Sequence, residues 1–165
     1  MKKLFLALAF AAVALFSSCD NNLVNHTGDA TGNLNAVWKL GAKTVITTGS
    51  DGKQVTEEAD YGKVNFFLAL GDFPFPHAIA KKGSFTDLDL KDVDVDACRY
   101  TYNADENKIS FSKLVSLTEG FLPLYSMSLL GTFDVLELTD KTFVIQQKAL
   151  GVTTIYAFSK YDNSK

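Results

Sequence analysis

From residue 36 onward, apolar and polar residues alternate along short segments, and this two-residue period limits the fold more than any other feature. In residues 97–103 the apolar Cys98, Tyr100 and Tyr102 alternate with polar residues, and residues 108–115 repeat the pattern after a polar turn. Successive side chains of a β-strand point to opposite faces, so the alternation predicts strands with one buried and one wet face. No long segment after the N-terminal region has the apolar spacing of an amphipathic helix, which argues against a helical bundle.

The short segments are rich in β-branched and aromatic residues and are bounded by Gly, Asp and Asn, which predicts about eight antiparallel strands. The predicted strands cover residues 36–47, 61–70, 83–89, 97–103, 108–115, 129–138, 142–148 and 152–160. Strands of this number and length fit a small closed barrel or a sandwich. We therefore expect an all-β fold in a single domain.

The N-terminus has the three parts of a secretory signal peptide. Two lysines follow Met1, residues 4–16 are uncharged and mostly apolar, and small residues precede Cys19. The apolar run is too short for a stable membrane-spanning helix, which needs about 20 residues. The Leu-Phe-Ser-Ser-Cys sequence that ends at Cys19 resembles a lipobox, in which the cysteine receives acyl chains such as palmitate and becomes the first mature residue. The alternative is an ordinary signal peptide that is cleaved after Ser18.

This interpretation divides the chain into three parts. Residues 1–18 form the predicted signal peptide, residues 19–34 the lipidated cysteine and a flexible tether, and residues 35–165 the barrel domain. The tether is polar, rich in turn-forming residues and without period, as linkers commonly are. Each buried methylene contributes about 0.8 kcal/mol, so two or three acyl chains would hold the protein at a membrane.

Cysteine content and charge narrow the classes of protein further. The chain has two cysteines, and with Cys19 lipidated only Cys98 remains, so no internal disulfide is expected. Stability must then come from the core, for which 47% hydrophobic residues and 13 phenylalanines provide the material. The net charge is −3, and Arg99 is the one arginine. A nucleic-acid partner is not expected, because affinity for phosphate backbones comes from Lys and Arg.

The chain contains one pattern of the kind that binds metal ions. Asp92, Asp94 and Asp96 occupy positions 1, 3 and 5 of a calcium loop, but Ala97 and Asn103 stand where that loop needs Gly and Glu. The apolar residues between these aspartates indicate strand alternation, with the carboxylates facing water and protecting a sheet edge from pairing. We predict no metal site and no cofactor.

The two histidines do not form a catalytic arrangement with a nucleophile. His26 lies in the predicted tether and His77 in a loop flanked by prolines, and neither has a second ligand at metal-binding spacing. Cys98 lies on the apolar face of a predicted strand, where cysteine is usually an inert hydrophobe. We therefore predict that the protein is not an enzyme.

Three segments resemble the lipocalin-like lipoproteins of the Bacteroidetes. These are residues 32–40 with their single tryptophan, the hairpin that joins residues 100–102 to 109–111, and the late hairpin of residues 131–145. The chain departs from the family pattern at Phe133, where tryptophan is frequent, and lacks the Gly-x-Trp signature of true lipocalins. The resemblance implies a lipocalin-like antiparallel barrel and a location in the cell envelope, and most such proteins have no assigned function.

Apolar residues in two predicted loops and on the predicted strands suggest a place for binding. The loops of residues 66–79 and 114–130 are rich in Phe, Leu and Tyr, as at the mouth of a barrel that holds an apolar ligand. The residues predicted to line such a pocket are Trp38, Phe67, Tyr100, Tyr102 and Phe111. Two alternatives stay open, since the same residues could form a docking patch for a partner protein or fill the barrel as core.

The expected function is therefore that of a non-enzymatic lipoprotein of the cell envelope that binds a small apolar ligand or an envelope partner. Its alternative is a structural or interaction lipoprotein with a filled barrel and no ligand. The predicted location is the outer membrane, reached through the N-terminal lipid, with the domain facing the periplasm or the cell surface.

Overall fold

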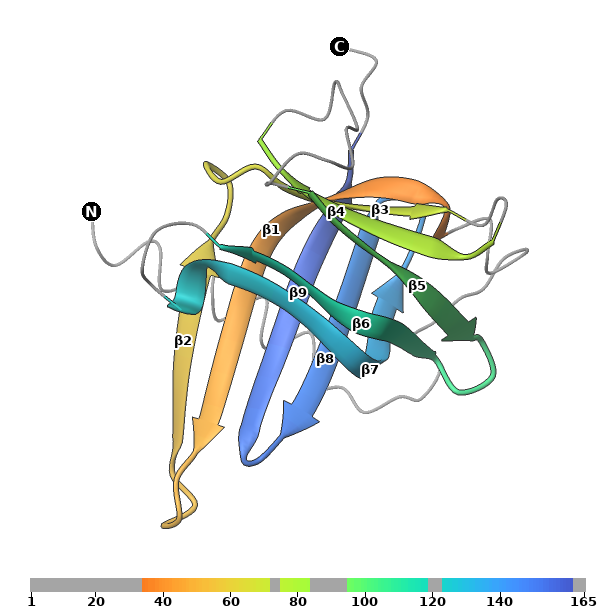
Figure 1. Cartoon of the computed structure of the whole chain (residues 1–165). Helices are drawn as coiled ribbons and strands as arrows, with labels where there is room; N and C mark the ends of the chain where they lie inside the picture. The colour runs from red at the N-terminus through yellow and green to blue at the C-terminus, as the bar shows by residue number, and fades with distance from the viewer. Residues whose placement is uncertain (1–33, 72–74, 84–94, 119–122, 162–165) are drawn as a thin grey trace.

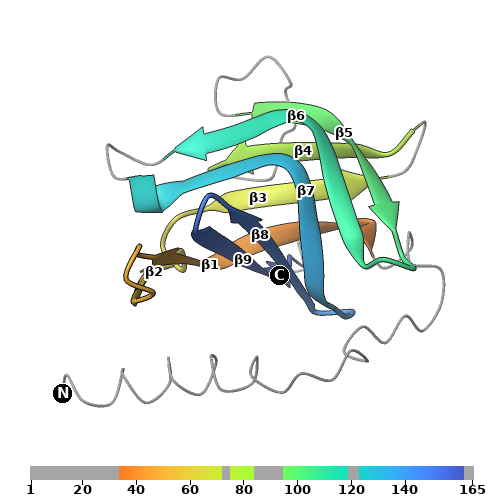
Figure 2. The same ribbon diagram turned by 90° about the horizontal axis from the view of Figure 1, so that it is seen from below.

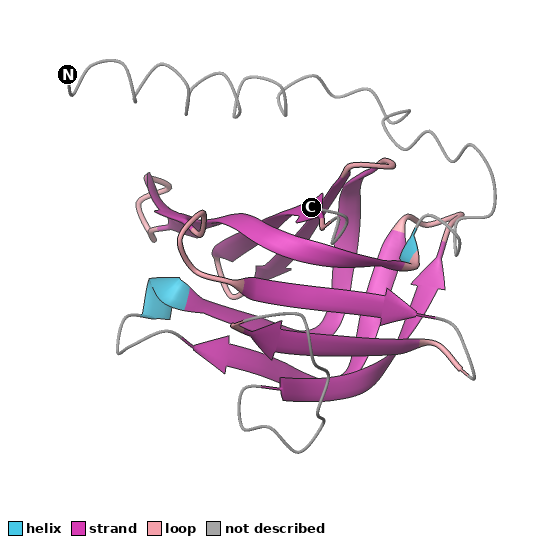
Figure 3. Ribbon diagram, turned by 90° about the horizontal axis from the view of Figure 1, so that it is seen from above, coloured by secondary structure: helices cyan, strands magenta, loops and turns pink. Residues whose placement is uncertain are grey.

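The computed structural model describes residues 34–71, 75–83, 95–118 and 123–161, which form nine strands and one short 3-10 helix (Figure 3). The elements are β1 (Ala36–Thr48), β2 (Gln54–Asp60), β3 (Phe66–Gly71), β4 (His77–Lys82), β5 (Val95–Asn103), β6 (Lys108–Thr118), η1 (Pro123–Tyr125), β7 (Ser126–Leu138), β8 (Thr142–Ala149) and β9 (Val152–Lys160). Cys19 and the predicted tether up to Asn33 lie outside these residues.

The strands form one antiparallel sheet that closes on itself. Its order is β2-β1-β3-β4-β5-β6-β7-β8-β9, and β1 also pairs with β9, which completes a barrel of eight strands with β2 as an extra strand (Figure 1). Closure leaves few open edges, because nearly every strand has a neighbour on both sides. The predicted all-β fold with a single barrel of about eight strands is thereby confirmed.

The second predicted strand, residues 61–70, is in fact the later part of a strand that is broken in two. After the β1 turn the chain returns as β2, pairing Thr48 with Gln54 through Ala42 with Asp60, and then resumes as β3, pairing Lys39 with Phe67. Residues 61–65 loop out between the two pieces. β2 therefore lies outside the barrel wall on one side of β1, while the other side of β1 pairs with β9 over the same residues 42–47 (Figure 1).

The structure differs from the sequence prediction at two further places. Strand β4 begins within the predicted loop of residues 66–79. It pairs with β3 and β5, and its inner face buries only the small residues Ala78 and Ala80. The predicted strand 83–89 lies almost entirely outside the described residues.

Strands β6 and β7 bend at the same place, and this bend divides β7 into two halves (Figure 2). Their register shifts between Phe111 and Val115, and Gly131 adopts a φ of 74° at the bend, a conformation that favours glycine. Beyond the bend β7 pairs with β8 from Asp134 to Leu138. Before the bend, residues 126–132 pair with β6 alone among the described strands.

Candidate functional site

Four of the five residues predicted to line a ligand pocket lie together on the inner face of the barrel. Trp38, Tyr100 and Phe111 are buried members of the hydrophobic core, and Tyr102 packs against it. The indole Nε1 of Trp38 donates a 3.0 Å hydrogen bond to the carbonyl of Leu34, which is itself fully buried. Burial raises the pKa of Tyr102 to about 12. These residues come from β1, β5 and β6, as the alternation of each strand requires.

Phe67, the fifth predicted residue, does not belong to this core cluster. Its neighbours Phe66 and Leu68 have their side chains in the core, and strand alternation turns Phe67 to the outer face. There its ring lies edge-on to Tyr161, with a centroid distance of 4.9 Å. The placement of Phe67 in the barrel interior was therefore wrong, and Phe66 takes that place.

Aromatic rings fill the space around the predicted ligand residues. They form a row of contacts across four strands and onward to Phe111. The ring centroids are 5.4 Å apart for Trp38–Phe143, 5.7 Å for Phe143–Phe158, 6.4 Å for Phe158–Tyr156, 6.3 Å for Tyr156–Phe133 and 5.8 Å for Phe133–Phe111. These are the distances of directly packed rings. Trp38 and Phe111, two of the residues expected to hold a ligand, thus pack against other rings of the core.

The two segments predicted as apolar loops, residues 66–79 and 114–130, are mostly strand in the structure, and their residues divide between core and surface. Met127 is fully buried, and Leu124 and Tyr125 pack against the core. Phe75 is 43% exposed and lies under the guanidinium of Arg99, 4.4 Å from the ring centroid. Phe73, Phe121 and Leu122 lie outside the described residues.

A row of polar side chains meets the edge of β7 before its bend. We call this contact the β7 seam, formed by Lys43, Gln147 and Tyr156 against residues 126–132. Lys43 Nζ donates to the Ser126 carbonyl over 2.8 Å. The hydroxyl of Tyr156 accepts from the Ser128 N–H over 3.1 Å and donates to its carbonyl over 3.2 Å. Gln147 Nε2 donates to the carbonyl of Leu130 over 2.8 Å. Side chains thus bind the backbone groups that a neighbouring strand would otherwise bind.

Burial sets the electrostatics of the seam. Lys43 is only 6% exposed, and desolvation lowers its pKa. Its ammonium lies 5.6 Å from the ring centroid of Tyr156, whose own pKa is raised by burial. Tyr61 joins the same end of the barrel by donating to the Leu124 carbonyl over 2.7 Å, and burial raises its pKa as well. Sequence alternation did not identify Lys43, because the β-bulge between Leu40 and Ala42 reverses which residues face inward.

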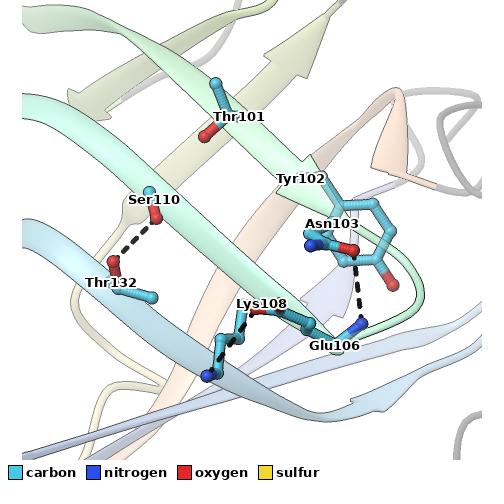
Figure 4. A pocket seen from close by; sticks show the side chains of 7 residues that line it. All are labelled: Thr101, Tyr102, Asn103, Glu106, Lys108, Ser110 and Thr132. Atoms are coloured by element: carbon cyan, nitrogen blue, oxygen red, sulfur yellow. Dashed lines mark hydrogen bonds and ion pairs between the residues drawn. The ribbon is translucent and has the colours of Figure 1, made fainter.

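The outer surface carries a hollow of about 370 Å³ over β5, β6 and β7. Its wall includes a cross-strand row of hydroxyls, Thr101, Ser110 and Thr132, and Ser110 and Thr132 are joined by a 2.8 Å hydrogen bond (Figure 4). Near the β5–β6 turn, Lys108 and Glu106 form an ion pair of 3.8 Å. The hollow is polar and open to solvent, and several of its lining groups pair with one another.

The predictions about metal and thiol chemistry fall partly on described residues. Asp96 accepts from Lys113 Nζ over 3.2 Å and from the Ser116 N–H over 3.3 Å, so its carboxylate has structural partners. Asp92, Asp94 and His26 lie outside the described residues. Cys98 is buried, and desolvation raises the pKa of its thiol, which lowers its reactivity. Within the described ranges, no group of three or more metal-ligating side chains comes together.

Comparisons with known proteins add no identity to this geometry. No known protein family, no curated protein and no solved structure matches the chain. Within the described residues, no helix has the length and apolar character needed to cross a membrane.

Proposed function

We propose that this protein is a non-enzymatic lipoprotein of the cell envelope, held at the outer membrane by a lipid on Cys19, whose barrel is filled and whose outer surface binds an envelope partner. The signal-like N-terminus supports the anchor. The row of packed rings supports the choice of surface over interior. Trp38, Tyr100 and Phe111 are at most 3% exposed. Trp38 packs against Phe143 and Phe111 against Phe133, so an apolar ligand beside either residue would have to separate rings that are already in contact.

A filled barrel also fits the size of the fold. An eight-stranded barrel is just wide enough for its own side chains to fill it. The inner faces of most strands of the barrel wall supply large residues, and those that are fully buried include Trp38, Phe66, Phe133 and Phe143. The interior then provides stability, and specificity is left to exposed backbone and polar side chains.

The experiment that tests this proposal has two arms. In the first, Cys19→Ala should move the protein from the membrane fraction to the soluble fraction of the cell, and an unchanged distribution would place the anchor elsewhere. Protease treatment of intact cells then reports whether the domain faces outward.

The second arm concerns the interior. Tyr100→Ala removes a ring from the core and should cost about 3–5 kcal/mol, seen as a lower unfolding midpoint in urea. Thr101→Ala, on the outer face of the same strand, is the matched control and should change stability by about 0.5 kcal/mol or less. The wild type should bind no fluorescent fatty-acid probe. Probe binding that Tyr100→Ala weakens without loss of stability would instead establish a ligand pocket.

A further inference from the structure

Strand β2 has an open backbone edge. Among the described residues it pairs with β1 alone, and all of its residues except Ala59 are exposed. The Tyr61 N–H donates to the Gly41 carbonyl and the Gly49 N–H to the Lys53 carbonyl, on either side of the paired region. These two hydrogen bonds define the hydrogen-bonding register of β2 against β1.

This register identifies which backbone groups of β2 are open. In an antiparallel ladder, pairs that exchange hydrogen bonds alternate with pairs that do not. Counting from Tyr61, the odd residues Val55 and Glu57 bond to β1, while Thr56 and Glu58 direct their N–H and C=O groups away from it. These groups have the spacing that an added strand would use.

The open edge is strongly acidic. β2 contains Glu57, Glu58 and Asp60 and no basic residue. The partners of the two glutamates across the sheet are Val45 and Thr44, which are uncharged. None of the ion pairs among the described residues includes either glutamate. Alternation places Glu57 and Glu58 on opposite faces, so negative charge lies on both sides of the edge.

This charge selects among strands that could pair here. Two copies of the chain joined antiparallel through β2 would bring the glutamates of one copy close to those of the other, which is unfavourable. A strand with basic side chains would place opposite charges across the new pair, which is favourable by about 0.2–1 kcal/mol for each pair. The charge of the edge therefore disfavours pairing with a second copy and favours pairing with a basic segment.

We propose that β2 is a docking edge for an extended, basic segment of a partner protein, which adds to the sheet as its next strand. The inference rests on the proposed function and specifies its partner. The main chain of Thr56 and Glu58 supplies the hydrogen bonds, and Glu57 and Glu58 pair with basic side chains on the two faces. This is strand addition at a sheet edge, in which the backbone gives affinity and the side chains give specificity.

The test uses the full chain purified from membranes in detergent and a short peptide of alternating valine and lysine. On peptide addition, amide hydrogen exchange should slow at Thr56 and Glu58. It should stay unchanged at Val55 and Glu57, which already donate to β1. A peptide of alternating valine and glutamate should not bind. Slowing at all four amides or at none would overturn strand addition.

Two variants separate backbone pairing from simple charge attraction. Thr56→Pro removes an outward N–H without touching the β1 ladder, a position where an edge strand tolerates proline. It should weaken peptide binding about tenfold relative to Thr56→Ala, which keeps the N–H. Replacing Glu57 and Glu58 together by lysine should transfer binding to the acidic peptide, and this result does not depend on how well Thr56→Pro folds. Glu106→Lys, on the distant β5–β6 turn, is the matched charge control and should leave binding unchanged.

The remaining outcomes each decide the question. Equal weakening by Glu106→Lys and by the β2 substitutions would show nonspecific attraction and overturn the proposal. Protection of Thr56 and Glu58 that rises with protein concentration in the absence of peptide would make the edge a contact between copies. Absence of peptide binding, in a protein that is membrane-anchored and binds no fatty-acid probe, would overturn the docking edge and leave the proposed function standing.

Discussion

Residues 126–132 of β7 and strand β2 both lack a strand on one side among the described residues, but side chains cover only the first of these edges. The β7 edge is met by Lys43, Gln147 and Tyr156, in contacts that are part-buried at Ser126 and Ser128 and exposed at Leu130. The β2 edge is exposed and carries the carboxylates of Glu57, Glu58 and Asp60. The difference follows from access to water. The exposed backbone groups of β2 can bond to solvent, whereas the part-buried groups of Ser126 and Ser128 have less access to it and bond to side chains.

The β7 seam shows how a barrel can close without a complete ladder. A buried carbonyl or N–H without a partner costs about 1–3 kcal/mol, and the open half of β7 presents several such groups. Long polar side chains from β1, β8 and β9 supply the partners, since these strands lie across the interior from that half of β7. The seam is thus a structural device, and β2 is the edge at which another chain can add.

The largest expected effect comes from opening the seam at its centre. Tyr156→Ala removes both the hydroxyl that bonds Ser128 and a ring of the aromatic row, so unfolding should become easier by about 3–5 kcal/mol. Tyr156→Phe keeps the ring and should cost about 1–3 kcal/mol, the price of leaving the Ser128 groups unpaired. Urea unfolding measures both variants.

The same experiment on β2 gives the contrast. Thr56→Ala changes an exposed side chain on the open edge and should shift stability by about 0.5 kcal/mol or less. If Tyr156→Phe were as mild as Thr56→Ala, the seam would not support the fold, and the two edges would be equivalent.

A smaller effect is expected from the pH dependence of the seam. Burial lowers the pKa of Lys43 below the value of 10.5 that a lysine has in the unfolded chain. Between the lowered pKa and 10.5 the unfolded chain binds more protons than the folded one, so folding stability rises with pH across that window. Lys43→Met removes this contribution and should alter stability little at neutral pH. It replaces a buried charge by an apolar chain of similar length, and the Ser126 carbonyl keeps the Tyr61 hydroxyl as a donor over 3.3 Å.

The measurement is the difference in unfolding free energy between wild type and Lys43→Met at neutral pH and near pH 10. The unfolding free energy of the wild type should increase relative to that of Lys43→Met as pH rises. Tyr102, with its pKa raised to about 12, destabilises both proteins above the ordinary tyrosine pKa of 10.0 and cancels in the difference. A difference that does not change with pH would mean that the Lys43 ammonium is solvated in the folded protein.

Alternation predicted most of the barrel, because most strands of its wall bury one face and leave the other exposed to water, although β3 and β8 bury residues on both faces. The prediction missed two strands, β2 and β4, which have no face of large buried residues. β2 has little to bury, since Ala59 is its one buried residue. β4 buries only Ala78 and Ala80 on the inner face, and the prolines before it indicated a loop.

The binding prediction was limited by tertiary structure. Trp38, Tyr100 and Phe111 were correctly placed inside from their strand positions. Whether inward rings line a cavity or touch one another depends on how far apart the walls lie, which local sequence does not determine. The seam was hidden for a similar reason, because Lys43 turns inward only through the bulge near Gly41, and the carbonyl it meets is distant in the chain.

The smallest expected effect on stability comes from removing the negative charges of Glu57 and Glu58 on β2. Replacing Glu57 and Glu58 by threonine keeps a residue suited to strands and removes the negative charge from both faces of the edge. Folding stability should change by about 0.5 kcal/mol or less, because both side chains are exposed and lack ion pairs among the described residues. The variant should nevertheless form dimers or larger species as concentration rises, since an open edge without charge is free to pair with itself.

Sedimentation of the variant and of the wild type at matched concentrations measures this self-association, with Glu106→Thr as the control for loss of one surface carboxylate elsewhere. A variant as monomeric as the wild type would mean that something other than charge keeps copies apart at β2, and the basic partner would then lose its main electrostatic argument.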